Sequence, residues 1–458
     1  MSTRLTTWIN PAAVRAYDLR GVVGRELDPD DAYALGLAYA TVARERNFRA
    51  IGVGRDGRLT SPELESALVR GLVAGGAYVT CIGLGPTPQL YFAVHTLGLD
   101  GGVMVTGSHN PPDQNGFKLL LGGHPVYGDE LKRLVQTASS ALPGGSVRRR
   151  AVRDTYAAAL ASMGQHLPAS KVVWDCGNGA VGAMIEALTS QLPGEHVLLN
   201  AKVDGRFPAH HPDPAVATNL SQLRSAVVAE GADLGIAFDG DGDRIGVVDE
   251  TGEIVWPDQL LLLLAEERLR SDPGATIVAD VKSSSVLFRR IAELGGRAVM
   301  APSGYVLVRA AMLASQAPLA GEMSGHIVFA EAWHGADDAP FVAIRVLNAL
   351  ARRGTRMAAF RETLPITVST PEIRMKCSDA RKHLVVREVM GRMKSCGAQI
   401  DTTDGIRVTR PDGWWLLRAS GTEAKLTARC EARDSAALQH LRHELSSQLA
   451  LSDVTCFN

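Results

Sequence analysis

The stretch Asp233–Arg244, DLGIAFDGDGDR, places an apolar run directly before a loop in which aspartate and glycine alternate. The run Asp233–Phe238 is short, apolar and bounded by polar residues, a pattern that predicts a buried β-strand. Glycines between Asp239, Asp241 and Asp243 leave the backbone unobstructed, so the three carboxylates can turn toward one point. A strand that runs into a polar loop decides the fold here, because the same arrangement recurs along the chain.

One pattern occurs three times between Arg49 and His326: strand, helix, strand, helix, strand, and then a polar loop rich in Gly, Ser or Asp. The expected strands cover residues 50–54, 78–82, 102–105, 171–175, 196–199, 233–238, 276–280, 297–300 and 318–320. The first helix is expected to have Ser61 as N-cap and Pro62 at its first helical position, and to stop at Gly75-Gly76. The three closing loops are Thr106–Asn110, Asp239–Arg244 and Gly321–His326.

Strands that alternate with helices predict an α/β fold, with three successive similar α/β domains and a smaller C-terminal α+β domain. In open α/β sheets, ligands gather beyond the carboxyl ends of the strands, which is where all three closing loops lie. This equivalent placement predicts that the loops contribute to one shared site. The expected domains are residues 1–150, 151–253, 254–364 and 365–458.

The composition excludes several classes of protein. A net charge of −1, from 48 basic and 49 acidic residues, gives no overall field toward nucleic acid or an anionic membrane. The six cysteines show no spacing typical of a disulfide or zinc framework, which favours free thiols in a reducing compartment. The chain has no apolar N-terminal leader and no run of about 18 apolar residues, so we expect a cytoplasmic protein.

The first closing loop, TGSHNPP, contains Ser108 between Gly107 and His109. Its position after an apolar strand predicts an exposed hydroxyl on a tight turn, although a serine in such a turn can also be a turn residue only. His109 is not expected to act as its base, because the partners in a Ser-His-Asp arrangement converge in space rather than by adjacency in sequence. Lys118, at the end of NGFK, is a better candidate to lie near reacting oxygens; the alternative is a solvated surface lysine.

The alternating aspartates favour a hard cation. Mg²⁺ prefers oxygen ligands and usually takes a few carboxylates together with a phosphate oxygen, which Asp239, Asp241 and Asp243 could supply. The alternative is an acidic surface turn. The loop lacks the glutamate that would complete an EF-hand, so a calcium sensor is not expected.

Two further loops carry groups suited to a sugar phosphate. Glu322, Ser324 and His326 offer an acceptor, a hydroxyl and an imidazole within five residues, although such a string can also be an ordinary polar turn. The loop Arg418–Thr422, RASGT, supplies a guanidinium, two hydroxyls and open backbone N–H groups, a combination that can cradle a phosphate. Neither a P-loop nor a dinucleotide-binding G-x-G-x-x-G sequence opens a helix, which disfavours nucleotide hydrolysis.

Taken together, the loops resemble the signatures of one family, the α-D-phosphohexomutases, in the family's order. The matching strings are TGSHNPPDQNGFK (106–118), DGDGDR (239–244), GEMSGH (321–326) and RASGT (418–422), with RAYDLRG (15–21) and GRDGR (54–58) nearer the start. The resemblance covers nearly the whole chain. GEMSGH is similar to the bacterial phosphomannomutase/phosphoglucomutase branch, whereas phosphoglucosamine mutases tend to carry Gln at the position of Met323.

The resemblance implies mixed sheets in four domains around a central cleft. It implies that Ser108 is a phosphoserine, with Ser108, Asp239, Asp241 and Asp243 holding Mg²⁺. It implies catalytic roles for Lys118 and His326 as acid or base, and for Arg244. The substrate-binding residues that it implies are Tyr17, Arg20, Lys282, Glu322, Ser324, Arg418, Ser420, Gly421, Thr422 and Arg429. Tyr305 is also taken as a substrate-binding residue, although it stands where close relatives often have His. Gln114 replaces a commoner aromatic.

The implied activity is reversible phosphoryl transfer between C1 and C6 of mannose or glucose phosphates, through a hexose 1,6-bisphosphate that is also an activator. The expected partners are then hexose phosphates, and neither nucleic acid nor a membrane. The expected oligomeric state is a monomer or a weak dimer. Two alternatives stay open. One is a phosphoglucosamine mutase, and the other is a silent sugar-phosphate sensor, which would keep the Arg418 loop but need neither Ser108 nor the three aspartates.

Overall fold

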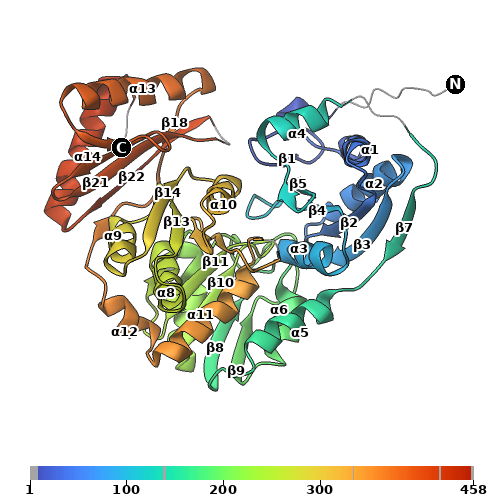
Figure 1. Ribbon diagram of the computed structural model, residues 1–458, viewed down its shortest axis with the longest axis horizontal. Helices are drawn as coiled ribbons and strands as arrows, with labels where there is room; N and C mark the ends of the chain where they lie inside the picture. The colour runs from blue at the N-terminus through green and yellow to red at the C-terminus, as the bar shows by residue number, and fades with distance from the viewer. Residues whose placement is uncertain (1–8, 138–140, 334, 422–423, 455–458) are drawn as a thin grey trace. The chain divides into compact units, whose positions relative to one another are not determined.

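A computed structural model of the chain describes residues 9–137, 141–333, 335–421 and 424–454 (Figure 1). The chain divides into two compact units, Met1–Leu264 with Ser324–Ala359, and Ala265–Met323 with Phe360–Asn458. The stretch expected to form the third domain is thus shared between the two units. No helix in the described ranges is both long and apolar enough to cross a membrane.

The first sheet of the first unit is mixed. Its strands are β1 (Leu19–Val22), β2 (Ala50–Arg55), β3 (Tyr78–Leu84), β4 (Gly101–Val105), β5 (Gln114–Leu121), β6 (His124–Pro125) and β7 (Ser146–Arg149). The order is β1-β5-β4-β2-β3-β7, with β6 paired to β5. Strands β2, β3, β4 and β7 run parallel, whereas β5 is antiparallel to both β4 and β1. The carboxyl ends of β2 and β4 therefore lie at one edge of the sheet.

Side-chain alternation along the strands gives this sheet two buried faces. Val103 and Val105 pack into the core shared with α1 (Pro29–Glu45), α2 (Ser61–Ala74) and α4 (Gly128–Val135). Met104, between them, faces the core formed with α3 (Thr87–Thr96), on the other side (Figure 1). Burial on both faces explains why these strands read as continuous apolar runs.

The expected N-cap of α2 was wrong by one residue. The helix begins at Ser61 itself, with Thr60 in the cap position and no side-chain cap bond. Ser61 Oγ instead donates to Asp56 Oδ1, because that carboxylate lies buried at the end of β2 and collects donors there. The end of the helix at Gly75 was predicted correctly.

The second sheet of the first unit has the order β12-β11-β10-β8-β9. Its elements are β8 (Ser170–Asp175), β9 (Gly194–Leu199), β10 (Leu234–Phe238), β11 (Ile245–Asp249) and β12 (Ile254–Val255), with helices α5 (Arg153–Met163), α6 (Gly182–Thr189) and α7 (Ser221–Glu230). Strands β8, β9 and β10 are parallel, and β11 returns antiparallel to β10. The hairpin between β10 and β11 is the acidic loop. The first unit also contains β16 (Ile327–Phe329) and α11 (Ala339–Arg353).

The second unit contains a parallel set, β13 (Thr276–Asp280), β14 (Arg297–Ala301) and β15 (Leu319–Gly321), with α9 (Ser285–Glu293) and α10 (Tyr305–Ala314). Helices α8 (Pro257–Ser271) and α12 (Met357–Glu362) each run from the first unit into the second. The second unit also holds an antiparallel sheet of β17 (Val368–Ser369), β18 (Ile373–Lys376), β19 (Gln399–Asp401), β20 (Ile406–Arg410), β21 (Gly413–Ala419) and β22 (Lys425–Ala432).

The antiparallel sheet is buried on both faces. Trp415 and Leu417 of β21 enter the core formed with α13 (Asp379–Ser395) and α14 (Ser435–Ala450). Trp414 and Leu416, which alternate with them, pack against Val281 just after β13. This second face joins the antiparallel sheet to the parallel set within one unit.

Arg407 of β20 anchors that junction. Its guanidinium lies 3.6 Å from the centre of the Trp414 ring, and Nη1 donates to the carbonyl oxygens of Val281 and Ser283. Burial lowers the pKa of Arg407 to about 10, still well above neutrality. Glu431 accepts hydrogen bonds from Ser284 Oγ and from Trp414 Nε1, each at 2.9 Å. The junction is therefore polar but hydrogen-bonded.

Candidate active site

Ser108 lies in the loop that leaves β4, and its hydroxyl faces the acidic loop. Ser108 Oγ donates to Asp239 Oδ2 at 2.8 Å, and the backbone at Ser108 is left-handed, with φ of +50°. The expectation that this hydroxyl is exposed was wrong: Ser108 is only 1% exposed. The acidic loop from β10 approaches the serine loop closely and covers it.

The serine loop is held by two buried side chains from the end of β2. Arg58 donates to the carbonyl oxygens of Ser108 at 2.7 Å and Asn110 at 2.6 Å. Asp56 accepts from Thr106 Oγ1 at 2.9 Å and from the Gly107 amide at 3.2 Å. Both side chains are 1% exposed, so they maintain the uncommon backbone conformation at Ser108 from inside the protein.

The acidic loop needs its glycines because of this close approach. A Cβ at Gly240 would lie 2.4 Å from the carbonyl oxygen of Ser108, which no side chain could tolerate. Asp239 Oδ1 accepts from the amides of Asp243 and Arg244, at 3.1 and 3.2 Å, and so closes the loop on itself. The Thr87 amide, at the start of α3, donates to the Asp241 carbonyl at 2.8 Å.

The three aspartates form a buried cluster that could hold a cation. Each offers one carboxylate oxygen within 4.8 Å of the others, and all three residues are 1% exposed or less. Burial, together with Asp243 and Asp241, raises the pKa of Asp239 well above its usual range, and burial with Asp241 raises the pKa of Asp243. Asp241 Oδ1 and Asp243 Oδ1 are buried and have no hydrogen-bond partner among the described residues. Unpaired carboxylate oxygens facing a common point suit a hard divalent cation.

Lys118 of β5 reaches the same cluster. Its ammonium lies 2.8 Å from Asp241 Oδ2 and also contacts Asp243 Oδ2. Burial would lower the pKa of Lys118, but these two carboxylates outweigh it and raise the pKa well above its usual value. Burial alone would raise the pKa of Asp241, but the Lys118 ammonium outweighs burial and lowers the pKa of that carboxyl. The surface-lysine alternative is therefore excluded, since Lys118 is 4% exposed.

His326 lies beside the acidic cluster, within the first unit. Its Nε2 accepts from Arg244 Nε at 3.0 Å, and its Nδ1 lies 2.9 Å from Asp337 Oδ2. His109, which the sequence argument set aside, brings its Nδ1 to 3.2 Å from Ser108 Oγ. Burial and the nearby guanidinium of Arg244 lower the pKa of His109 well below its usual value, so this imidazole is neutral.

The remaining site residues of the first unit lie near its loops. Arg20 of β1 donates to Asp18 at 2.8 Å and to Asn110 of the serine loop at 2.9 Å. Tyr17 is half-buried just before β1, and Ser324 is half-buried two residues before His326. Gln114, in place of a commoner aromatic, accepts from the Asn110 side chain at 2.7 Å and so helps to shape the serine loop.

A second cluster lies in the second unit, around Lys282. The lysine ammonium is 3.6 Å from both Asp280 Oδ2 and Glu322 Oε1, and 3.7 Å from Glu372 Oε2. Burial would lower its pKa, but these three carboxylates raise it. Ser303 Oγ donates toward Asp280 or Glu322, each 3.1 Å away. Glu322 is thus held in place, with cation and hydroxyl neighbours.

The predicted phosphate-binding loop lies at the end of β21. Arg418 Nε donates to Asp404 Oδ2 at 2.7 Å, and the Ser303 amide donates to the same oxygen at 3.0 Å. Lys382 of α13 donates to the Ser420 carbonyl at 2.7 Å, which brings a further buried cation to the loop. Asp404 therefore orients the guanidinium of Arg418.

The other predicted residues of this unit differ in their surroundings. Gly421 is exposed, and Thr422 lies outside the described residues. Arg429 of β22 is half-buried, and its Nε has no hydrogen-bond partner within the described ranges. Tyr305 is buried at the first position of α10.

The described predicted residues thus fall into two groups, one in each unit, around the acidic loop and around Lys282 and Arg418. The sequence argument missed the residues that support them, namely Asp404, Glu372, Lys382 and Asp337, and it rejected His109. Apart from the adjacency of His109 to Ser108, no local signal marks them, because the contact of each depends on how the intervening chain folds.

Comparison with known proteins places these clusters in a family. The chain matches the four domains described as "Phosphoglucomutase/phosphomannomutase, alpha/beta/alpha" domains I, II and III and the C-terminal domain, over residues 12–141, 154–252, 256–366 and 372–448. It is 42% identical over 438 residues to a phosphomannomutase/phosphoglucomutase of Pseudomonas syringae pv. tomato, covering 95% of this chain and 94% of that protein. It is 39% identical over 440 residues to a phosphoglucomutase of Neisseria gonorrhoeae, covering 94% and 95%.

A crystal structure of a phosphoglucomutase/phosphomannomutase family protein from Burkholderia thailandensis has the same architecture, with a TM-score of 0.90 at 40% identity, covering 96% of this chain and 98% of that one. The fold expected from the sequence is confirmed. The chain therefore belongs to the phosphoglucomutase/phosphomannomutase family and is a phosphohexomutase, an isomerase of hexose phosphates.

Proposed function

We propose that the enzyme interconverts the 1- and 6-phosphates of mannose and glucose through a phosphoserine at Ser108 and a hexose 1,6-bisphosphate. The observation that supports this most is the contact of Ser108 Oγ with Asp239, inside a cluster of three buried aspartates. A serine hydroxyl at this point can carry a phosphoryl group whose oxygens meet a cation and Lys118.

The proposed cation is Mg²⁺, held by Asp239, Asp241, Asp243 and a phosphate oxygen on Ser108. The buried, unpartnered oxygens of Asp241 and Asp243 fit this assignment. When bound, the cation offsets negative charge on the transferring phosphoryl oxygens. Lys118, paired to the same aspartates, adds a second positive charge at that point.

The transfer breaks the bond between phosphorus and Ser108 Oγ and forms a bond between phosphorus and the free sugar hydroxyl oxygen. The proton of that hydroxyl passes to His326, which accepts through Nε2, and then on to the Ser108 oxygen released. The 1,6-bisphosphate then turns around, its other phosphoryl group bonds to Ser108 Oγ, and the serine proton passes back through His326 to the sugar oxygen released. Lys118 suits the role of cation better than that of base, because its ion pairs keep it charged.

The second cluster would hold the parts of the ligand that do not react. Glu322 and Ser324 are proposed to bind sugar hydroxyls, with Lys282 holding Glu322. The non-reacting phosphate is proposed to bind Arg418, Ser420, Gly421, Thr422 and Arg429. The guanidinium of Arg418 already lies oriented by Asp404, which reduces the cost of ordering it on binding.

A phosphoglucosamine mutase is the rival within the class. Relatives near 40% identity over almost the whole chain are phosphomannomutase/phosphoglucomutases and phosphoglucomutases, which favours mannose and glucose. A silent sensor is disfavoured because the serine, the aspartates and Lys118 form one connected cluster.

The test combines intact-mass measurement with substrate assays. Protein treated with glucose 1,6-bisphosphate should gain one phosphate, located on Ser108 by peptide mapping, and should use mannose 1-phosphate and glucose 1-phosphate. A protein that turns over substrate without any phosphorylated form would contradict the mechanism. Faster turnover of glucosamine 6-phosphate would favour the rival.

A further inference from the structure

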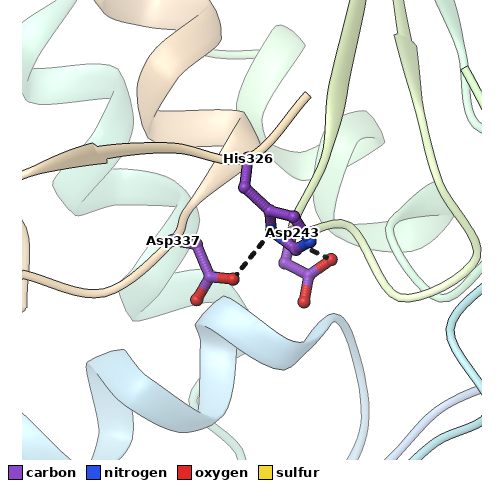
Figure 2. Close-up of side chains that lie close together, drawn as sticks. All are labelled: Asp243, His326 and Asp337. Carbon is purple, nitrogen blue, oxygen red and sulfur yellow. Dashed lines mark ion pairs between the residues drawn. The ribbon is translucent and has the colours of Figure 1, made fainter. Parts of the chain in front are cut away.

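His326 lies between two carboxylates, one from the acidic loop and one from outside it. Figure 2 shows the imidazole with Asp243 on one side and Asp337 on the other. The Nδ1 atom is 2.9 Å from Asp337 Oδ2 and 3.9 Å from Asp243 Oδ1. Asp243 belongs to the proposed cation site, whereas Asp337 does not. Asp337 is therefore the carboxylate that remains available to the imidazole.

A hydrogen bond from Arg244 defines which ring nitrogen of His326 carries the proton. Arg244 Nε always bears a hydrogen and donates it to His326 Nε2 at 3.0 Å, so Nε2 must present a lone pair. In a neutral imidazole the hydrogen then lies on Nδ1, which faces Asp337. The Arg244 hydrogen bond selects this tautomer. The Asp337 carboxylate, 2.9 Å from Nδ1, favours it electrostatically, and Asp337 Oδ2 accepts no hydrogen bond within the described part of the chain.

The hydrogen bond from Arg244 Nε to His326 Nε2 also argues against a metal ion held by Asp243, His326 and Asp337, although the ligand atoms of these three residues lie within 4.8 Å of one another. A metal on Nδ1 would require that nitrogen to be unprotonated, and the hydrogen would then be on Nε2. Two N–H groups, those of Nε2 and of Arg244 Nε, would oppose each other at 3.0 Å.

The fold fixes Asp337 in place through its neighbour. Asp337 pairs with Val328 in an isolated β-bridge, and Asp338 follows with extended backbone, so adjacent side chains point to opposite sides. Asp338 caps α11 by accepting from the Phe341 amide at 2.8 Å. It also accepts from Tyr156 Oη at 2.7 Å and from Trp333 Nε1 at 2.6 Å.

Aromatic packing reinforces this anchor. The Trp333 ring lies 4.9 Å from that of Phe92 on α3 and 6.3 Å from that of Tyr156 on α5, measured between ring centres, and both pairs meet edge to face. The loop that carries Asp337 is therefore fixed to helices from two different domains of the first unit.

We propose that Asp337 is a positioning residue for His326. It holds the imidazole in the tautomer that has hydrogen on Nδ1 and a lone pair on Nε2. When a sugar hydroxyl replaces the Arg244 N–H group at Nε2, that lone pair can take the hydroxyl proton. Asp337 then faces the imidazolium until the proton passes to the oxygen released. This inference rests on the proposed function, in which His326 exchanges that proton.

The test is nitrogen NMR of protein labelled with ¹⁵N-histidine, with the His326 signal assigned by its absence from His326→Gln. Wild type should show protonated Nδ1 and unprotonated Nε2. Asp337→Ala should lose that preference and lower kcat roughly 10- to 100-fold with little change in KM. Asp337→Asn keeps the side-chain volume and should also lower kcat, whereas Asp337→Glu should restore part of it.

Asp204→Asn is the control, because it alters a carboxylate that pairs with Arg206 and does not contact His326 or Asp337. It should keep the wild-type tautomer and kcat. An Asp337→Ala protein that keeps both tautomer and kcat would overturn the proposal, as would a bound zinc ion that this variant loses. Full activity of His326→Gln would instead remove His326 as the base, while the tautomer measurement would still report on Asp337.

Discussion

Ser108 Oγ donates a hydrogen bond to Asp239 Oδ2 at 2.8 Å, and this bond joins the loop after β4 to the loop after β10. The two residues are 131 positions apart and belong to different sheets. A phosphoryl group on Ser108 would therefore lie next to the acidic cluster. The following expectations depend on this contact and on the clusters around it.

Ser108→Ala should lower mutase turnover by orders of magnitude, because the variant has no oxygen to carry the phosphoryl group. Stability should fall by only about 1 kcal/mol, the usual cost of one lost hydrogen bond, since alanine fits the same space. Turnover and Tm measured beside Ser66→Ala, an exposed serine on α2, test both statements. Near-normal turnover in Ser108→Ala would remove the phosphoserine mechanism.

Asp241→Asn should weaken metal binding and reduce activity at limiting Mg²⁺, because one of three clustered carboxylates loses its charge. Excess chelator should abolish wild-type activity, and added Mg²⁺ should restore it. Titration of activity with Mg²⁺ measures the shift. Asp204→Asn changes a carboxylate outside the cluster and should leave the titration unchanged. Full activity in chelator would exclude the cation from the mechanism.

Arg418→Ala should raise KM roughly tenfold in both directions, since one guanidinium is expected to hold whichever phosphate is not reacting. Initial rates with the 1-phosphate and with the 6-phosphate give the two values. The control is Arg410→Ala, which removes another arginine of the same antiparallel sheet, one that pairs with Glu444 of α14. An effect confined to one direction would argue against a shared phosphate site.

Glu322 should make the enzyme use mannose and glucose phosphates comparably but discriminate against galactose phosphates. A carboxylate can accept from two neighbouring hydroxyls, and O3 and O4 roughly exchange places when the bisphosphate turns. Galactose inverts C4 and should lose a charge-assisted hydrogen bond, on the order of 1.5 to 3 kcal/mol, or ten- to a hundredfold in kcat/KM. Comparison of the three 1-phosphates, in wild type and in Glu322→Gln, decides this. Equal use of galactose 1-phosphate by wild type would show that Glu322 does not sense O4.

Asp338 should make stability depend on pH. Burial raises the pKa of Asp338 to about 6, above its unfolded value near 4, even though three groups donate to the carboxylate. The contribution of protonated Asp338 to the free energy of unfolding is therefore fully present below about pH 4 and is lost as the pH rises through about 6. The loss is on the order of 3 kcal/mol. The Tm of wild type minus that of Asp338→Asn should fall across this window. Asp204→Asn should parallel wild type there, because its hydrogen bonds with Arg206 lower the pKa of Asp204 to about 2.

The strands were the most predictable part of the molecule. Every strand expected between residues 50 and 320 lies within two residues of an observed one at each end. Strands buried on both faces, such as β4 and β10, stand out as short apolar runs. The acidic loop was equally visible, since its glycines are required where Gly240 meets the Ser108 carbonyl oxygen. A backbone that must approach another segment closely requires glycine, and such glycines are visible in the sequence.

No sequence pattern indicates the side-chain contacts between separate segments of the chain. The burial of Ser108 depends on how closely a loop from another sheet approaches, and the sequence alone does not report that distance. Asp337 and Asp404 look like ordinary loop acids, and only the fold places them against His326 and Arg418. His109 was set aside because adjacency rarely gives side-chain contact, yet the left-handed backbone at Ser108 brings the two side chains together.

The junction around Arg407 has a consequence for how the polypeptide can be divided. If residues 365–458 were produced as a separate fragment, Trp414 and Leu416 would lose their cover, and the donors to Glu431 from Ser284 and Ser285 would be missing. Such a fragment would present an indole and a leucine to solvent beside a carboxylate that had lost its serine donors, and self-association would be the expected result. The segment 365–458, which we propose to bind phosphate, is thus not expected to fold as an independent domain, because it needs the parallel set that it packs against.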